Sequence, residues 1–137
     1  AFTGASAAET ERIERIAEGL PRCVNLSGKL GWEEFLAAVE GAKAVVCVDS
    51  VISHLASAVD TPCVVLMPGM TNLNHWRPSG QNSHVLSQPL PCSPCYQSRG
   101  CASMECIRGI GVEEVLAKLD GALGGAATAL WPQSQPE

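Results

Sequence analysis

Three polar side chains that could bind a ligand follow one short apolar run. Asp49 ends the run, Ser50 comes next, and His54 lies four residues after Ser50. The N-terminus of a helix exposes backbone N–H groups and carries a partial positive charge, so His54 in a first helical turn would complete an anion site. The purely structural alternatives to a ligand site are ordinary N-capping by Asp49 or Ser50 and a partly buried His54 bonded to a neighbouring carbonyl. The residues alone leave both readings open.

Alternating strands and helices are predicted to position these residues. Helices are expected at 7–20, 31–42, 50–59 and 112–123, and strands at 22–26, 44–48, 63–67 and 83–87, after an opening that resembles the end of a strand. This alternation predicts an α/β fold, a Rossmann-like parallel sheet with helices on both faces. The run 44–48 does not alternate, which favours a strand buried on both faces.

The carboxyl ends of parallel strands meet at one edge of a sheet, where ligands bind. Four polar or glycine-containing steps should therefore gather around one crevice. They are Thr3–Gly4, Ser27–Gly28, Asp49–Ser50 and Pro68–Gly69. The same edge is expected to carry a polar-aromatic loop at 72–77. Its Arg77 could neutralise a phosphate, although a surface loop pinned by Trp76 explains it as well. His84 is assigned to an edge strand, without a functional role.

Composition excludes some classes of protein. The chain has 137 residues, 46% of them hydrophobic, and a formal net charge of -5. Nucleic-acid binding selects basic surfaces, so no nucleic-acid partner is expected. No apolar run approaches the roughly 20 residues of a membrane span, and there is no signal-peptide pattern.

Cysteine is frequent, with seven residues in the chain. Cys47 and Cys63 lie in apolar runs and are expected to be buried core thiols. Four others form a cluster with the spacing C-x2-C-x5-C-x4-C, namely Cys92, Cys95, Cys101 and Cys106. Four thiolates can hold a structural zinc ion that fastens an irregular loop. An iron–sulfur cluster, two disulfides or free thiols are the alternatives.

The segment G-A-K-A-V-V-C-V-D-S-V-I-S-H-L-A-S-A-V-D-T-P-C-V-V-L-M-P-G resembles the donor-binding half of family 9 glycosyltransferases, the ADP-heptose:lipopolysaccharide heptosyltransferases and their relatives. The matching positions of the family signature are Asp49, Ser50, His54, Leu55, Ala56 and Pro62. Upstream the resemblance includes Thr3–Gly4 and Glu9, and downstream P-C-S-P-C and V-E-E-V-L. It covers the chain from Ala1 to about Leu123.

The resemblance implies the second, donor-binding domain of a two-domain GT-B enzyme. Residues 1–123 would form this domain, including a cysteine-rich loop at 89–106, and residues 124–137 would be a disordered tail. The domain's first strand and the N-terminal acceptor-binding domain with its catalytic base would lie outside this sequence. The chain alone is therefore not expected to catalyse transfer.

The resemblance also assigns site residues. Asp49, Ser50 and His54 would line the donor diphosphate, assisted by the backbone N–H groups of Ser50 and Val51. Glu9 would hold the ribose hydroxyls and Leu30 would pack against the base, although a first-turn helix acid and a core residue explain these two equally well. The family's glycine after Asp-Ser is Val51 here. Valine crowds a phosphate and disfavours positive φ, which argues against tight donor binding.

The implied function is transfer of a heptose-like sugar from a nucleotide diphosphate to lipopolysaccharide or a related glycan. The nucleotide sugar, resembling ADP-heptose, would be a substrate, and zinc the one structural cofactor. A non-catalytic nucleotide-binding module or a zinc-stapled interaction module is the alternative. The implied setting is the bacterial cytoplasm, with association at the inner face of the inner membrane through the missing domain as a further expectation.

Overall fold

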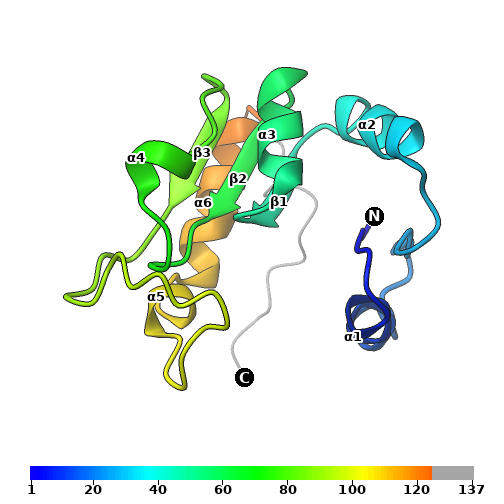
Figure 1. Cartoon of the computed structure of the whole chain (residues 1–137). Coiled ribbons are helices and arrows are strands. Elements are labelled where there is room, and N and C mark those ends of the chain that lie inside the picture. The colour runs from blue at the N-terminus through cyan, green and yellow to red at the C-terminus, as the bar shows by residue number, and fades with distance from the viewer. Residues whose placement is uncertain (125–137) are drawn as a thin grey trace, which may run out of the picture. The chain divides into compact units, whose positions relative to one another are not determined.

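The computed structural model describes residues 1–124, and these residues form two compact units (Figure 1). The first unit is Ala1–Ala38 and the second begins at Val39. Apart from Gly124, the tail expected at 124–137 lies outside the described residues. None of the described helices is both long and apolar enough to cross a membrane.

The first unit is built around helix α1 (Ala7–Ala17). Ser6 and Glu9 form a reciprocal capping box that starts the helix,. The strand expected at 22–26 is wrong, because only an isolated parallel bridge, Phe2↔Asn25, is present. Within residues 1–124, the segment 22–26 pairs with Phe2 alone, and a single bridge does not make a strand. Helix α2 (Trp32–Glu40) follows and continues into the second unit.

The second unit contains a three-stranded parallel sheet. Its strands are β1 (Val45–Val48), β2 (Cys63–Leu66) and β3 (Ser83–Leu86), in the order β1-β2-β3. In the register, Val45 is opposite Cys63 and Cys63 is opposite Ser83. Helix α3 (Val51–Ala58) connects β1 to β2, and the short helix α4 (Leu73–Trp76) lies between β2 and β3. The predicted parallel α/β arrangement is confirmed.

Helices cover this sheet. Helix α3 contacts all three strands, and α6 (Val112–Ala122) contacts β2 and passes behind the sheet in Figure 1. A further short helix, α5 (Glu105–Arg108), precedes α6. The core lies along β2, where Cys63, Val64 and Val65 are fully buried. Parallel strands covered on both faces have this continuous apolar character.

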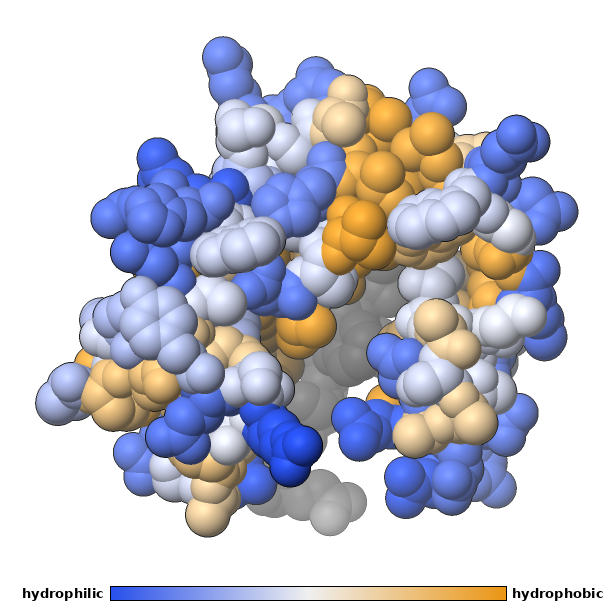
Figure 2. Space-filling model, viewed as in Figure 1, coloured by the Kyte–Doolittle hydropathy of each residue, from blue (hydrophilic) through white to orange (hydrophobic). Residues whose placement is uncertain are grey.

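Strand β1 differs from the prediction of burial on both faces. Val45 is buried, but Val46 and Val48 are 46% and 55% exposed. The reason is the position of β1 in the sheet, because in the described part of the chain it pairs with β2 alone. Hydrophobic surface gathers in Figure 2 over the region where Figure 1 draws β1 and α3.

Candidate functional site

The carboxyl ends of β1 and β2 are linked by a side-chain hydrogen bond. Asp49 directly follows β1 and is half-buried, and its Oδ2 accepts from Thr71 Oγ1 at 3.1 Å. Thr71 lies five residues past the end of β2. The edge predicted to hold a ligand therefore brings polar residues from two neighbouring strands together. Thr71 was missed by sequence reasoning, and its one signal was a hydroxyl just beyond the Pro68–Gly69 step.

The N-terminus of α3 is not capped by a side chain. Ser50 occupies the N-cap position with extended backbone, φ -160° and ψ 173°, and its exposed side chain makes no capping hydrogen bond. The Asp49 carboxylate bonds Thr71 instead. The Ser50 carbonyl accepts from Ser53 N at 3.1 Å and Ser53 Oγ at 2.7 Å. The capping alternative is therefore wrong for both side chains, and no side chain caps the first-turn N–H groups,.

His54 lies in the first turn of α3 and is exposed to solvent. The alternative of a partly buried histidine does not describe it. Val51 is the first residue of the same helix, and its side chain is 49% exposed. The φ angle of Val51 is not positive, so valine in place of glycine imposes no backbone strain. The remaining effect of Val51 is the bulk of its side chain beside the helix N-terminus.

The other two predicted donor-binding residues lie in the first unit. Glu9 is exposed, and its Oε2 accepts from Ala5 N at 3.1 Å, Ser6 N at 2.9 Å and Ser6 Oγ at 2.7 Å. The hydrogen bonds from Ser6, first through its backbone, and then from Ala5 lower the pKa of Glu9. Leu30 is half-buried. Glu9 is therefore a first-turn helix acid, the alternative that the sequence left open, and it caps α1 together with Ser6.

The first unit also joins two of the predicted glycine-containing steps. Gly28 N donates to Gly4 O at 2.9 Å, so Thr3–Gly4 and Ser27–Gly28 lie together. Gly4 is closely packed, because a Cβ there would lie 2.9 Å from Glu9 Cβ. The first unit therefore brings together two of the four predicted steps, and in the second unit Asp49 bonds Thr71, which follows the Pro68–Gly69 step.

The expectation of structural zinc is not supported. Across residues 1–124, no group of three or more His, Cys, Asp or Glu residues could hold a metal ion. Local contacts take up one of the four sulfurs: Cys101 Sγ accepts from Met104 N at 3.4 Å and lies 3.7 Å from Ser103 Oγ. The bond from Met104, followed by that from Ser103, lowers the pKa of Cys101. Without such a metal site among the described residues, the alternative of a zinc-stapled interaction module is not supported either.

The cysteine-rich loop is attached to the sheet edge by its backbone. Cys95 N donates to Gly69 O and Tyr96 N donates to Met70 O, each at 3.0 Å. Gly69 allows this close approach, because a Cβ there would collide with Ser93 Oγ and lie 3.2 Å from Cys106 Cβ. The loop therefore packs on the segment that leads from β2 to Thr71.

The polar-aromatic loop contains helix α4, where only loop had been predicted. Asn72 caps this helix by accepting from Asn74 N at 3.0 Å. Trp76 is 56% exposed, so it does not pin the loop to the core as the alternative required. Arg77 is exposed at the end of α4. His84 lies on β3, at the edge of the described sheet, as predicted.

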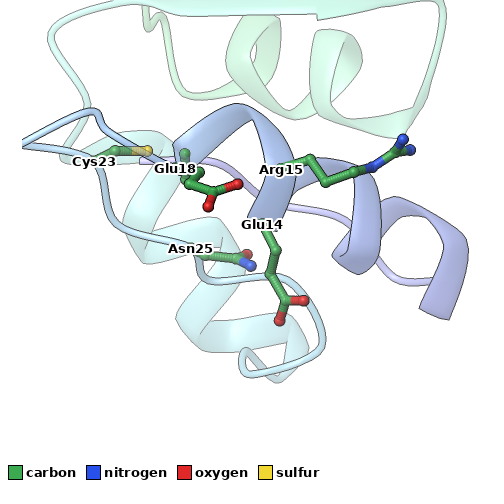
Figure 3. A pocket seen from close by; sticks show the side chains of 6 residues that line it. Glu14, Arg15, Glu18, Cys23 and Asn25 are labelled. Carbon is green, nitrogen blue, oxygen red and sulfur yellow. The ribbon is translucent and has the colours of Figure 1, made fainter.

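A surface hollow of about 460 Å³ lies elsewhere, in the first unit (Figure 3). Its lining residues are Glu14, Arg15, Ala17, Glu18, Cys23 and Asn25. Figure 3 shows Arg15 pointing away from Asn25 and both glutamates. Two carboxylates disfavour a phosphate group, and none of the predicted site residues lines this hollow.

The parallel sheet with polar residues at its carboxyl edge defines a Rossmann-like α/β domain,. Residues 1–105 match the model of glycosyltransferase family 9 (heptosyltransferase), and the chain belongs to this family. It is 38% identical over 92 residues to lipopolysaccharide heptosyltransferase 1 of Pseudomonas aeruginosa. The matched region is 67% of this chain and 25% of that protein. It is also 36% identical over 72 residues to lipopolysaccharide heptosyltransferase 3 of Escherichia coli. That matched region is 51% of this chain and 21% of the relative.

The chain thus matches about a quarter of the length of these curated relatives. No solved structure is significantly similar to it. The match to the family model establishes the family, and the parallel sheet establishes the fold class.

Proposed function

We propose that this chain is the donor-binding part of a GT-B glycosyltransferase that moves a heptose-like sugar from a nucleotide diphosphate to lipopolysaccharide or a related glycan. Family membership and the two heptosyltransferase relatives support the reaction class. The reaction would replace the nucleoside diphosphate at the anomeric carbon. The acceptor and catalytic base would belong to a further domain.

The observation that carries this proposal is the open N-terminus of α3. Its first-turn N–H groups have no capping side chain, and exposed Ser50 and His54 flank them. These groups would donate hydrogen bonds to the diphosphate, and the helix dipole would favour its negative charge. A site that binds the departing diphosphate also stabilises the charge that develops there during transfer.

Asp49 would have a different role in the same site. A carboxylate accepts hydrogen bonds and repels phosphate, so we assign it to a hydroxyl group of the sugar. Thr71 holds one carboxylate oxygen from the β2 side. Glu9 and Leu30 remain the proposed contacts to the ribose and the base.

We also propose that a further strand pairs with the free edge of β1. In the described sheet this edge has no partner, and it presents the exposed side chains of Val46 and Val48. An edge strand leaves a row of backbone N–H and C=O groups unpaired, and a further strand can satisfy them. A strand contributed by residues outside this sequence would complete the sheet next to Asp49.

Calorimetric titration with ADP, UDP, GDP and CDP tests the donor site. We expect saturable binding of one nucleotide and a loss of roughly ten- to a hundredfold in affinity for His54→Ala, because a charge-assisted hydrogen bond contributes roughly 1.5–3 kcal/mol. Ser50→Ala should weaken binding less. Binding that is equal in all three proteins would contradict the proposal.

The matched control is His84→Gln. His84 lies near the amino end of β3, opposite Val64 in the register and therefore away from the carboxyl edge. Its replacement should leave nucleotide affinity unchanged. Equal losses for His54→Ala and His84→Gln would show a general effect of the substitutions and would remove the support for this site.

A further inference from the structure

Two thiols face each other inside the second unit. Cys47 on β1 and Cys63 on β2 place their Sγ atoms 3.7 Å apart. Cys63 is fully buried and Cys47 is partly exposed. The cysteine cluster of the loop is separate from this pair, and the proposed donor site does not use either sulfur.

The register decides which chemistry suits the pair. Cys63 is opposite Val45 and Cys47 is opposite Val65, so the two cysteines are diagonal neighbours. With strands about 4.8 Å apart and a rise of about 3.3 Å per residue, their Cα atoms are roughly 8 Å apart. A disulfide needs Cα atoms within about 6.8 Å. Direct oxidation of the pair would therefore require the two strands to move.

A single atom bonded to both sulfurs requires no such movement. At bond lengths of roughly 2.3 Å and bond angles of about 90 to 110°, it holds two sulfurs about 3.3–3.8 Å apart. The observed 3.7 Å falls in this range. Zinc would need further ligands, and no group of three ligating residues occurs among the described residues. The partner that fits two sulfurs alone is a trivalent, thiophilic metalloid.

We propose that Cys47 and Cys63 form a dithiol site that binds one monosubstituted trivalent arsenical per chain. In the reaction R–As(OH)2 loses both hydroxyl groups, two As–S bonds form, and the two thiol protons leave in two molecules of water. No oxidant or reductant is needed. Cys47 reacts first because it is partly exposed, and Cys63 then closes the ring.

The hydrogen bond between the two sulfurs shifts the pKa of each thiol. Its effect, followed by burial, raises the pKa of Cys47, while the same bond lowers the pKa of Cys63. In the free pair Cys63 is therefore the more acidic thiol, and the order of reaction rests on the accessibility of Cys47. The site lies two residues before Asp49, but it does not depend on the nucleotide site.

The test uses the full chain with Cys23, Cys92, Cys95, Cys101 and Cys106 changed to Ser, which leaves only the pair. Phenylarsine oxide is the probe, and intact-mass spectrometry counts the adducts on the folded protein. We expect one adduct that resists excess glutathione and is removed by dithiothreitol, because chelation by two thiols outlasts attachment to one.

Cys47→Ser in the same background is the second variant, and it leaves the buried Cys63 unchanged. Its adduct should be absent or removed by glutathione. The proposal is overturned if the parent protein takes no adduct, takes two, or reacts only in denaturant. It is also overturned if Cys47→Ser retains a glutathione-resistant adduct. Circular dichroism of both proteins confirms that the reaction occurs in the folded state.

Discussion

The hydroxyl of Thr71 donates to the carboxylate of Asp49 over 3.1 Å, joining the segment after β2 to the end of β1. Thr71→Val removes this donor while keeping the shape of the side chain. If Asp49 contacts the sugar, Thr71→Val should weaken binding of a nucleotide sugar by roughly ten- to a hundredfold, because a hydrogen bond to a charged group is worth roughly 1.5–3 kcal/mol. Calorimetry with the nucleotide sugar measures this loss.

Affinity for the bare nucleoside diphosphate is the control for that variant. It should stay within about twofold of the wild type, because the proposed phosphate contacts come from α3. Thr10→Val, in helix α1, is the matched substitution, since its hydroxyl bonds only the Ser6 carbonyl. A Thr71→Val protein that loses both ligands equally would show that Thr71 supports the fold rather than orients Asp49.

Glu9 should make the stability of the first unit depend on pH. Its hydrogen bonds lower its pKa from the ordinary value of 4.5. Its ionised form therefore stabilises the folded state fully above about pH 4.5, and this contribution is lost as the pH falls through the lowered folded value. Urea unfolding between pH 2.5 and 7, followed by α1 amide signals, measures the effect.

Glu9→Gln is the matched variant for this measurement, because a glutamine keeps the capping geometry without the charge. Its stability should not fall over the same pH range. Ser6→Ala should cost about 1 kcal/mol at neutral pH by removing the N-cap. An unchanged pH profile in Glu9→Gln would show that other carboxylates carry the dependence.

Gly69→Ala should destabilise the packing of the cysteine-rich loop by about 1–3 kcal/mol, the usual cost of overpacking. The added Cβ would collide with Ser93 Oγ. That hydroxyl is buried without a hydrogen-bond partner, so Ser93→Ala alone should be close to neutral. The double variant Gly69→Ala/Ser93→Ala should be more stable than Gly69→Ala. Thermal unfolding of the four proteins gives the coupling, and strictly additive effects would rule out this contact.

The loop should not depend on a metal ion. It is held by backbone hydrogen bonds to Gly69 and Met70 rather than by converging sulfurs. Treatment with a chelator should therefore leave the thermal midpoint unchanged, and elemental analysis should find no zinc in stoichiometric amount. A stoichiometric metal whose removal unfolds the loop would contradict this expectation.

Sequence patterns predicted the three strands of the second unit and helices α3 and α6, because each has a strong local signal, but they missed the short helices α4 and α5. The apolar run 63–67 predicted β2, with Pro62 before it and Pro68 after it as boundaries. The pattern could not say how many neighbours each strand has. Val46 and Val48 are as apolar as the residues of β2, but their exposure depends on pairing that a single segment does not encode.

The candidate site was predicted in part for a similar reason. Asp49, Ser50 and His54 lie close in sequence around one strand-to-helix step, so their local arrangement could be anticipated. Thr71 reaches Asp49 across 22 positions, and only the register of β1 and β2 brings them together. The cysteines were over-interpreted, since spacing suggests possible ligands but not the local bonds that Cys101 makes.

The most direct test of the central claim is an amide NMR titration of the chain with the nucleoside diphosphate that binds in calorimetry. If the open N-terminus of α3 holds the diphosphate, the largest shifts should fall on Ser50, Val51 and Ile52, and His54→Ala should reduce them. Shifts centred on the hollow beside Glu14 and Asn25, with the amides of α3 unchanged, would contradict the account.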